Sequence, residues 1–463
     1  MVQGVSIDNG CIINRNPATG EEIGRVPITK PDELDEMVAR AAESQRAWSQ
    51  TPAKERISLL RNGLKELATK SEILVNMIVQ EMGKPFDQAK EEVEGAVSKD
   101  EFLDILQASL EPKKHGSSVV VRQPLGVVTV LSPWNFPADE ILLLMLPALG
   151  SGNTVIVKPS EVTPCTGAIV VDTIASVLPT GVLQLAQGDG STGAHLVSHP
   201  SINMIAMTGS SATGKKIMQE AAPKLKRIVL ELGGKDPMII FDDADLEKAA
   251  ADAVAYSLSN TGQVCCSIER IYVAASVYEQ VQKLVTQYAA DYKVGNGMEP
   301  SVKVGPLVSA MQRDTVKEHV EDATAKGAKL LYQSDVPSES NGNFYPVSAL
   351  ADVKEGMKLY REETFGPIVS LSPFDGTEEE AIRLANDTEY GLASCIYTRD
   401  MDRAQRVATA IEAGQVGINC YSLEHMDVAC PWVGHKNSGF GYHSGEEGFH
   451  QFSVPKTLVY SPE

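Results

Sequence analysis

GVVTVLSPWNFPADEILLLMLPALGSGNTVIVKPSE, residues 126–161, is the stretch that decides the fold. It opens with a β-branched run at 127–131, continues with an apolar segment at 141–149 and returns to a β-branched run at 154–157. Nearly continuous apolar runs are typical of strands buried on both faces, and the segment between them suits a crossover helix. This order predicts a parallel sheet covered by helices on both faces.

A second set of alternating runs extends this pattern into the C-terminal half. The apolar run 228–230 ends at Glu231 and the pattern then starts again, so two α/β domains are expected to meet near residues 230–235. Strands are expected at 182–185, 202–206, 237–241, 270–273, 369–371, 394–397 and 415–419, and helices at 166–178, from 214, from 245 and at 278–292.

The first third of the chain is predicted to be helical. Apolar residues at helical spacing indicate helices at 31–50, from Pro52 onward, at 71–82 and at 87–110. Residues 117–125 read as a strand outside any strand–helix–strand unit, and residues 452–460 as a last extended segment. We expect these two segments to form a small sheet of their own.

Composition and charge exclude several classes of function. At 463 residues the chain is too long for one simple core, so two or three domains are expected, and 43% hydrophobic with 22% charged residues is typical of an ordinary soluble protein. Its 41 basic and 61 acidic residues give a net charge of −20. This charge argues against nucleic acid or an anionic membrane as a partner, because both require a positive surface.

The cysteines and the N-terminus bear on the compartment. The seven cysteines are irregularly spaced, without a Cys-x-x-Cys pair, so neither a disulfide framework nor a zinc site is expected. No signal peptide is recognisable in MVQGVSIDNG, and the apolar run 141–149 is about half the length of a membrane span. A reducing, cytoplasmic location is predicted, with organelle targeting left open.

NTGQVCCSIER, residues 260–270, carries the most informative chemistry. A cysteine in such a protein is most often a small buried hydrophobic residue. Cys265 differs because two other residues suited to catalysis occur in nearby motifs. Glu231 ends an apolar run in ELGGK (231–235), and Asn135 lies between two prolines in PWNFP (133–137). A thiol nucleophile, a carboxylate base and an amide donor are the groups that acyl-transfer chemistry requires.

TGSSATGKK, residues 208–216, follows a predicted strand and opens a helix. Glycine-rich turns of this kind bind phosphate through free backbone N–H groups and the helix dipole. The pattern is one residue away from the phosphate loop of NTPases, but Lys216 stands where that loop needs a hydroxyl for Mg²⁺, so an NTPase is disfavoured. The alternative to a phosphate-binding role is that this turn only begins a helix.

VKPSE, residues 157–161, ends a strand with a cation and an anion. Ligands of open parallel sheets bind beyond the carboxyl ends of the strands, where Lys158 and Glu161 are able to bond ribose hydroxyls. A capping glutamate and a solvated lysine are the equally open alternative. EETFGP (362–367) alone is weak evidence for a further ribose contact.

PWVGHKNSGFG, residues 431–441, is a glycine-rich aromatic loop suited to wall a pocket. His435 and His443 are expected to be surface or hydrogen-bonded histidines rather than ligands. No pair of histidines has metal-ligand spacing, so no metal site is predicted.

Together these motifs occur in the order and spacing of the aldehyde dehydrogenase superfamily, which the chain resembles from about Asn16 to Leu458. ELGGK followed downstream by GQVC is the specific part. The resemblance implies an α/β fold with a Rossmann-like NAD(P) domain at 1–110 and 125–233, an α/β catalytic domain at 234–445, and small oligomerisation strands at 111–124 and 446–463. It also implies a homodimer or homotetramer.

The same resemblance implies roles for individual residues. Cys265 would attack the aldehyde carbon, and the Asn135 amide with the Cys265 backbone N–H would bond the oxyanion of the thiohemiacetal. Glu231 would take a proton from the water that hydrolyses the thioester. The residues implied in NAD(P) binding are Ser132, Pro133, Trp134, Lys158, Ser160, Glu161, Gly209, Ser210, Leu232, Glu363 and Phe365.

Two residues bear on cofactor choice and on redox sensitivity. A carboxylate at Glu161 on the ribose hydroxyls repels a 2′-phosphate, so NAD is predicted over NADP, and Lys158 nearby softens that preference. Cys266 is predicted to be a spectator. The alternative is that oxidation links it to Cys265 and switches the enzyme off reversibly.

The substrate class follows from departures from the family pattern. Relatives that oxidise succinic semialdehyde usually carry arginines where this chain has Ser259 and Leu143, so a substrate carboxylate lacks its expected partners. Leu143-Leu144 predicts an apolar tunnel wall, and Val433 replaces a usual glycine of the closing loop. We expect a general oxidiser of aliphatic or aromatic aldehydes. The alternatives are a succinate-semialdehyde, other semialdehyde or betaine-aldehyde dehydrogenase and, in a different class, a non-enzymatic structural protein that keeps the fold.

Overall fold

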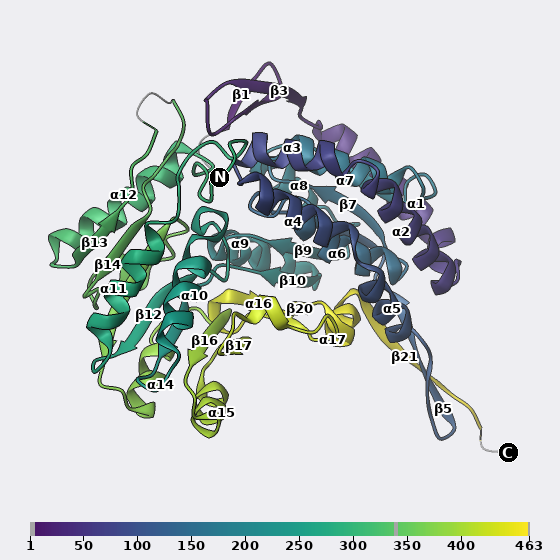
Figure 1. Cartoon of the computed structure of the whole chain (residues 1–463). Helices are drawn as coiled ribbons and strands as arrows, with labels where there is room; N and C mark the ends of the chain where they lie inside the picture. Colours follow the sequence, from purple (N-terminus) through teal and green to yellow (C-terminus); the bar gives the residue numbers. More distant parts are fainter. Residues whose placement is uncertain (1–4, 338–340, 462–463) are drawn as a thin grey trace.

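Two sheets, each covered by helices, form the body of the structure (Figure 1), a computed structural model that describes residues 5–337 and 341–461. The first sheet has the order β19-β10-β9-β6-β7-β8, and its strands are parallel except for the short edge strand β19. Neighbouring strands β6 and β9 connect outward in opposite directions, which makes their carboxyl ends the topological switch point. The bounds are β6 Val127–Leu131, β7 Thr154–Lys158, β8 Leu183–Leu185, β9 Met204–Thr208, β10 Arg227–Glu231 and β19 Gly439–Phe440.

Side chains of the first sheet alternate between two apolar layers. Val128, Val155 and Met204 point into a core with helices α2–α7, and Ile156 and Ile205 into a core with α1, α8 and α9. Both faces are therefore buried, as the continuous apolar strands predict. The helices are α1 Pro31–Gln50, α2 Ala53–Ala68, α3 Ser71–Met82, α4 Phe86–Val97, α5 Asp100–Ser109, α6 Asp139–Gly150, α7 Pro164–Ala175, α8 Gly190–Ser198 and α9 Ser211–Ala221.

The second sheet has the order β13-β14-β15-β12-β11-β16-β17, with only β13 antiparallel to its neighbour. It too is covered on both faces. Its strands are β11 Asp236–Ile240, β12 Ile268–Ala274, β13 Lys329–Gln333, β14 Ser348–Ala351, β15 Ile368–Phe374, β16 Ala393–Tyr397 and β17 Gln415–Ile418. Its helices are α10 Leu246–Leu258, α11 Tyr278–Ala289, α12 Ala310–Ala325, α13 Lys358–Arg361, α14 Glu378–Asn386, α15 Met401–Ala410 and α16 Ser422–His425.

Two expectations for the first third were wrong in detail. Residues ahead of α1 are not helical but form an antiparallel sheet of β1 Ser6–Asp8, β2 Cys11–Arg15 and β3 Glu22–Pro27. The helix predicted at 87–110 is two helices, α4 and α5, because Ser98 and Lys99 leave the helical conformation. The Lys99 ammonium instead reaches the Asp139 carboxylate at 2.7 Å.

The isolated strand and the C-terminal segment do pair, as expected. β5 Ser118–Pro124 lies antiparallel to β21 Ser453–Val459, and β4 Lys113–His115 completes the sheet. This sheet extends from the body as an arm that ends near the C-terminus (Figure 1). A short pair, β18 Trp432–Val433 with β20 Tyr442–His443, and helix α17 Gly445–Phe449 lie between the second sheet and the arm.

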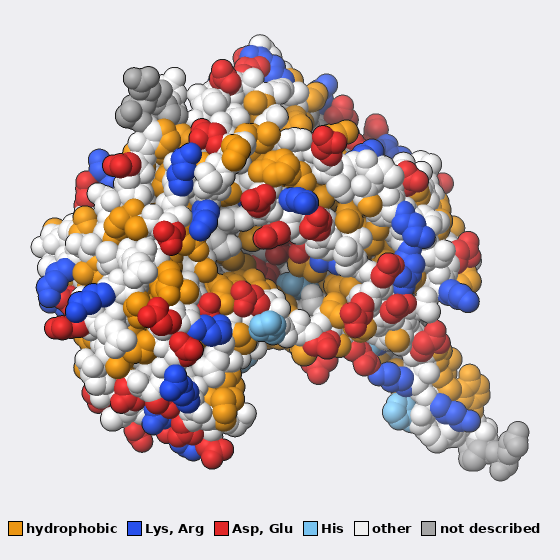
Figure 2. All heavy atoms as spheres, viewed as in Figure 1, with side chains coloured by type: hydrophobic (Ala, Val, Ile, Leu, Met, Phe, Trp, Pro, Cys, Tyr) orange, Lys and Arg blue, Asp and Glu red, His pale blue; other side chains and the backbone are white. Residues whose placement is uncertain are grey.

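The surface carries charges of both signs. Acidic and basic side chains are interspersed over the face in Figure 2, which is hollowed between the two sheets. Across residues 5–337 and 341–461, no helix is long and apolar enough to span a bilayer.

Candidate active site

A cavity of about 330 Å³ lies at the switch point of the first sheet. The segments that follow β6, β7 and β9 form its walls, which is where open parallel sheets bind ligands. Eight of the eleven residues predicted to bind a cofactor line it: Ser132, Pro133, Trp134, Lys158, Ser160, Glu161, Gly209 and Ser210.

The polar groups of this cavity suit a dinucleotide. Ser210 caps α9, its side chain accepting from the N–H of Thr213, so the first N–H groups of that helix face an anion site. The Lys158 ammonium donates to the Glu161 carboxylate over 3.2 Å, and both side chains are largely buried. A cation, a carboxylate and a helix N-terminus are thus grouped around one cavity.

A second cavity of about 230 Å³ continues from the first and holds the predicted catalytic residues. Cys265, Glu231 and Asn135 line it, although they come from segments far apart in the sequence. Glu363 and Phe365 line it too, and the Phe365 ring meets that of Trp134 edge-on with centroids 5.5 Å apart.

The loop that carries Cys265 is held in an unusual conformation. Asn260, Thr261 and Gly262 all have left-handed φ, of 50°, 62° and 72°. Such strain persists only where the surroundings enforce it. Here the Asn260 amide donates to the carbonyls of Asn135 and Gln263 at 3.0 and 3.1 Å, and a Cβ on Gly262 would lie 2.0 Å from the carbonyl oxygen of Gly366.

Glu231 is a buried carboxyl with incomplete hydrogen bonding. The Trp432 indole N–H donates to its Oε1 over 3.3 Å, and Oε2 has no hydrogen-bond partner among the described residues. Burial, reinforced by the charge of Glu140, raises the pKa of Glu231 well above its usual range, and the Cys265 thiol and Trp432 offset this in part. A carboxylate with a raised pKa is a better proton acceptor.

Cys265 shares its surroundings with Cys266. The interaction with the Cys266 thiol, burial and the nearby Glu231 raise the pKa of the Cys265 thiol. Cys266 is buried, and the Tyr421 hydroxyl donates to its carbonyl at 2.8 Å and lies 3.0 Å from its sulfur. All seven cysteines are free thiols.

The Asn135 side chain is fixed beside the thiol. One amide N–H donates to the carbonyl of Gln263 at 3.1 Å, two residues before Cys265. The amide carries a second N–H. That hydrogen remains for another acceptor in the cavity.

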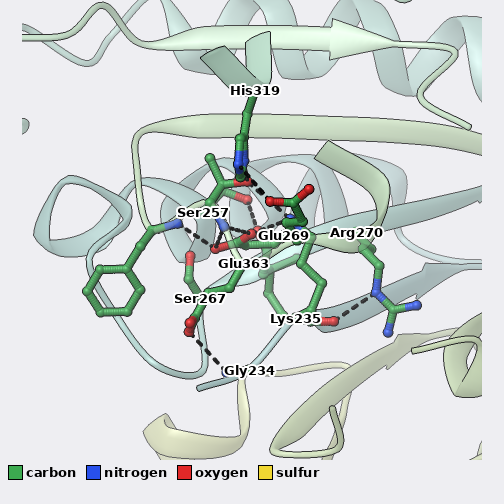
Figure 3. Close-up of polar contacts among 12 residues, drawn as sticks. Gly234, Lys235, Ser257, Ser267, Glu269, Arg270, His319 and Glu363 are labelled. Atoms are coloured by element: carbon green, nitrogen blue, oxygen red, sulfur yellow. Dashed lines mark hydrogen bonds and ion pairs between the residues drawn. The ribbon is translucent and has the colours of Figure 1, made fainter. Parts of the chain in front are cut away.

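A buried ion pair of Lys235 and Glu269 lies beside Glu363 (Figure 3). The Glu269 carboxylate is paired with Lys235 and accepts from the backbone N–H groups of Thr364 and Phe365. Phe365 has a positive φ of 54° there. Glu363 in turn accepts from the N–H of Gly234 at 3.1 Å. Burial, with the charge of Glu269, raises the pKa of Glu363 to about 8.

A third cavity, of about 290 Å³, opens on the other side of Cys265. Its walls are mostly apolar, formed by Phe102, Phe136, Leu143, Val264, Leu423, Met426, Val428 and Trp432. Lys99, Asp139 and Glu140 are its charged residues, and the sequence analysis did not single them out. The only signal for Glu140 was a carboxylate directly before the apolar run 141–149.

Four sequence expectations are refined by these positions. Leu232 lines neither of the first two cavities but packs against Gly214 in the core below α9. Leu143 walls the third cavity as expected, whereas Leu144 is buried in the core. Ser259 is exposed and outside all three cavities. His443 was expected at the surface or hydrogen-bonded. It is buried, its Nδ1 lies 2.8 Å from the Ser444 hydroxyl, and its Nε2 has no partner in the described part of the chain.

The closing loop takes part as expected, since Trp432 walls the third cavity. Over residues 5–337 and 341–461, no three or more His, Cys, Asp or Glu side chains are grouped so as to hold a metal ion.

Comparisons with known proteins agree on one family. The sequence model of the aldehyde dehydrogenase family matches residues 5–458. Glutarate-semialdehyde dehydrogenase of Pseudomonas putida is 37% identical over 98% of this chain and 95% of its own length. The NADP(+)-dependent succinate-semialdehyde dehydrogenase of Escherichia coli is 36% identical over 94% and 92%. A crystal structure of aldehyde dehydrogenase C from Pseudomonas syringae with NAD+ and octanal superimposes with a TM-score of 0.92, at 31% identity over 98% and 94% of the two chains.

Proposed function

Because the chain belongs to the aldehyde dehydrogenase family, and so oxidises an aldehyde with NAD(P)⁺, we propose that Cys265, Glu231 and Asn135 perform the chemistry. The observation that supports this assignment is that one cavity brings the three together beside the cofactor cavity. The eleven cofactor residues of the sequence analysis are proposed to bind NAD(P), with Leu232 acting through the packing of α9 rather than by contact.

The cofactor cavity fits NAD(P). The N-terminus of α9 would receive the pyrophosphate, and Lys158 and Glu161 the adenosine ribose. Glu363 and Phe365 would receive the nicotinamide ribose and ring. When bound there, NAD(P)⁺ supplies the hydride acceptor of the oxidation.

Cys265 acts as the nucleophile. The Cys265 thiol loses its proton to water, and the thiolate sulfur bonds to the aldehyde carbon, giving a thiohemiacetal oxyanion. The second N–H of Asn135 and the backbone N–H of Cys265 donate to that oxyanion, each worth roughly 3 kcal/mol. Loss of hydride then leaves a thioester on Cys265.

Glu231 acts as the base that releases the acid. Its raised pKa makes its carboxylate form a stronger base than that of an exposed glutamate. Water attacks the thioester carbon, its proton passes to Glu231, and the carbon–sulfur bond breaks with the electron pair returning to Cys265.

The decisive experiment compares NADH formation from hexanal by wild-type enzyme with that by Cys265→Ala and Glu231→Gln. We expect no turnover for the first. For the second we expect a single burst of NADH followed by slow turnover, because only thioester hydrolysis is impaired. Full-rate turnover by Cys265→Ala would refute the assignment.

We propose a preference for uncharged aliphatic or aromatic aldehydes. The lysine of the third cavity is already paired with Asp139, and Glu140 adds a further acidic group, so a substrate carboxylate finds no free cation among the lining residues. Glutarate and succinate semialdehyde are the second candidate substrates, because two relatives are named for them. A higher kcat/KM for succinic semialdehyde than for hexanal or benzaldehyde would reverse this order.

We also propose that the chain assembles as a homodimer or homotetramer through its arm. A three-stranded sheet that leaves the body exposes apolar side chains, Val459 and Tyr460 among them at 76% and 56%. Analytical ultracentrifugation tests this directly. A cytoplasmic location is proposed on the seven free thiols, which a reducing compartment maintains, and cell fractionation checks it.

A further inference from the structure

Glu140 is an acidic residue that the proposed chemistry does not use, yet it lies beside the reacting groups. It stands in the first turn of α6 and lines the third cavity together with Cys265. Its Oε2 accepts a hydrogen bond of 2.8 Å from the Thr208 hydroxyl. The carboxyl group is therefore held in place on the side of the thiol that faces the substrate.

Thr208, which donates to Glu140, is the neighbour of Glu231 in the sheet. Thr208 ends β9 and Glu231 ends β10, and the two residues are paired across these parallel strands. Oε2 of Glu231, without a partner among residues 5–337 and 341–461, is the atom left free to give up a proton. The carboxyl group of Glu231 therefore lies on the second cavity and that of Glu140 on the third, and both cavities are lined by Cys265.

Charged groups near Glu140 include a partly exposed ion pair. Asp139, its neighbour on α6, is paired with Lys99 between α4 and α5, and both side chains are partly exposed. Glu92 of α4 accepts from the backbone N–H groups at the start of α6. His443, on the opposite wall, is neutral near pH 7 because burial lowers its pKa to about 4.

We propose that Glu140 is the second carboxylate of acid release: it receives the proton that Glu231 takes from water and passes it to solvent past the Lys99–Asp139 pair. This role rests on the proposed action of Glu231 as the base. Burial, the charge of Asp139 and the other nearby groups raise the pKa of Glu140 to about 7, so the group both accepts and releases a proton near neutrality.

The proton count of the cycle requires such an acceptor. Hydrolysis of the thioester forms one carbon–oxygen bond, breaks the carbon–sulfur bond and leaves one water proton on Glu231. Before the next hydrolysis Glu231 must lose that proton. Glu363 lines the same cavity as Glu231, but its carboxylate accepts from the Gly234 N–H and is proposed to hold the nicotinamide ribose. Glu140, on the third cavity, is the carboxyl group to which we assign the proton.

The test separates hydride transfer from acid release in Glu140→Gln. Glutamine keeps an oxygen that accepts from Thr208, so the fold should be preserved. Stopped-flow measurement with hexanal should show an NADH burst of one equivalent per active site at a rate within twofold of wild type. Steady-state kcat should fall on the order of 10²-fold or more, in the range of 10²–10⁴-fold that proton-transfer groups contribute. Intact mass spectrometry of quenched enzyme should show the hexanoyl adduct accumulating on Cys265.

Three further measurements exclude a merely structural or electrostatic role. Glu140→Asp should recover part of the lost kcat, and formate or imidazole should raise kcat of Glu140→Gln but not of wild type. Glu101→Gln, which removes an exposed carboxylate of α5, is the matched control and should leave kcat unchanged. The pH profile of Cys265 alkylation by iodoacetamide, measured without cofactor, reports how far the lost charge alone lowers the thiol pKa.

Each outcome has one meaning. A Glu140→Gln kcat within twofold of wild type would overturn the proposal, as would loss of the burst together with kcat. If Glu140→Gln is alkylated faster near pH 7 but keeps its kcat, Glu140 acts only through the effect of its charge on the Cys265 thiol. If neither Glu140→Gln nor Glu231→Gln forms an adduct on Cys265, the assignment of the nucleophile fails instead.

Discussion

Replacing Gly234 by alanine should disable the enzyme without unfolding it. Gly234 joins β10 to β11 in ELGGK, and a Cβ built there would lie 2.3 Å from the carbonyl oxygen of Cys265. The contact is backbone, so no side-chain rotation relieves it. Its own N–H also fixes Glu363 at 3.1 Å.

The size of the effect follows from the displacement. Restoring an ordinary contact of roughly 3.4 Å requires the backbone at Cys265 to move by about 1 Å. A misplacement of that size costs on the order of 10²-fold in rate, because attack needs the sulfur aligned on the carbonyl carbon. We expect kcat of Gly234→Ala to fall about 100-fold, with a slower burst of NADH.

The assay is stopped-flow NADH formation with hexanal, together with near-UV circular dichroism and the thermal midpoint. Gly95→Ala is the matched control, because a Cβ there meets no described atom within 4 Å and the residue lies within helix α4. Alanine at that position should leave kcat unchanged and stabilise the helix by roughly 0.5–1 kcal/mol. Turnover of folded Gly234→Ala within twofold of wild type would refute the packing argument.

The remaining predictions concern the oxyanion, the cofactor and the pH dependence of stability. Asn135→Ala should lower kcat about 10²–10³-fold, measured as NADH formation, because one donor to the oxyanion is lost; an effect confined to KM would contradict this role. Glu161→Gln should raise kcat/KM for NADP⁺ relative to NAD⁺, because the repulsion of a 2′-phosphate is removed; an unchanged ratio would place selectivity elsewhere. Glu140 has a folded-state pKa raised from 4.5 to about 7, so its contribution to stability is present below pH 4.5 and is lost as the pH rises through 7. The thermal midpoint of Glu140→Gln minus that of wild type should therefore be larger at pH 8 than at pH 5. The same difference at both pH values would argue against a raised pKa of Glu140.

The parallel sheets were predictable because their signal is local. Strand runs such as 127–131 are apolar throughout, and only burial on both faces accounts for that composition. The pairing of β5 with β21 was also foreseen, although it joins distant segments, because both lie outside the alternating pattern.

The elements that were missed have weak local signals. Helix α12 buries only Val316, His319, Val320 and Ala323 among many charged residues, so its apolar period is short. Helix α8 contains two glycines. Ser98 and Lys99 break the helix between α4 and α5, and the ion pair of Lys99 with Asp139 found there is a contact that sequence spacing does not reveal.

At the site, the residues predicted from the sequence are those that belong to motifs, whereas residues that depend on their position in the fold were not predicted. Glu269 stands in the quoted stretch NTGQVCCSIER, yet its task of holding the Thr364 and Phe365 backbone depends on strand β12 meeting a loop a hundred residues away. Glu140 likewise resembles an ordinary acidic residue at the start of a helix. Only the structure shows that it bonds Thr208, which pairs with Glu231 across β9 and β10.

The electrostatics of the site explain why a second carboxyl group is useful there. Burial raises the pKa of Glu231, and the interaction with Cys266, followed by burial, raises that of the Cys265 thiol, so each group holds its proton more tightly. Like charges held this closely do not all ionise together, so the resting site retains a proton that must be moved before each attack. A single buried base would need a second group to take that proton away. A carboxyl group with a pKa about 7 at the edge of the substrate cavity removes this obstacle, and it does so without placing a permanent charge beside the thiol.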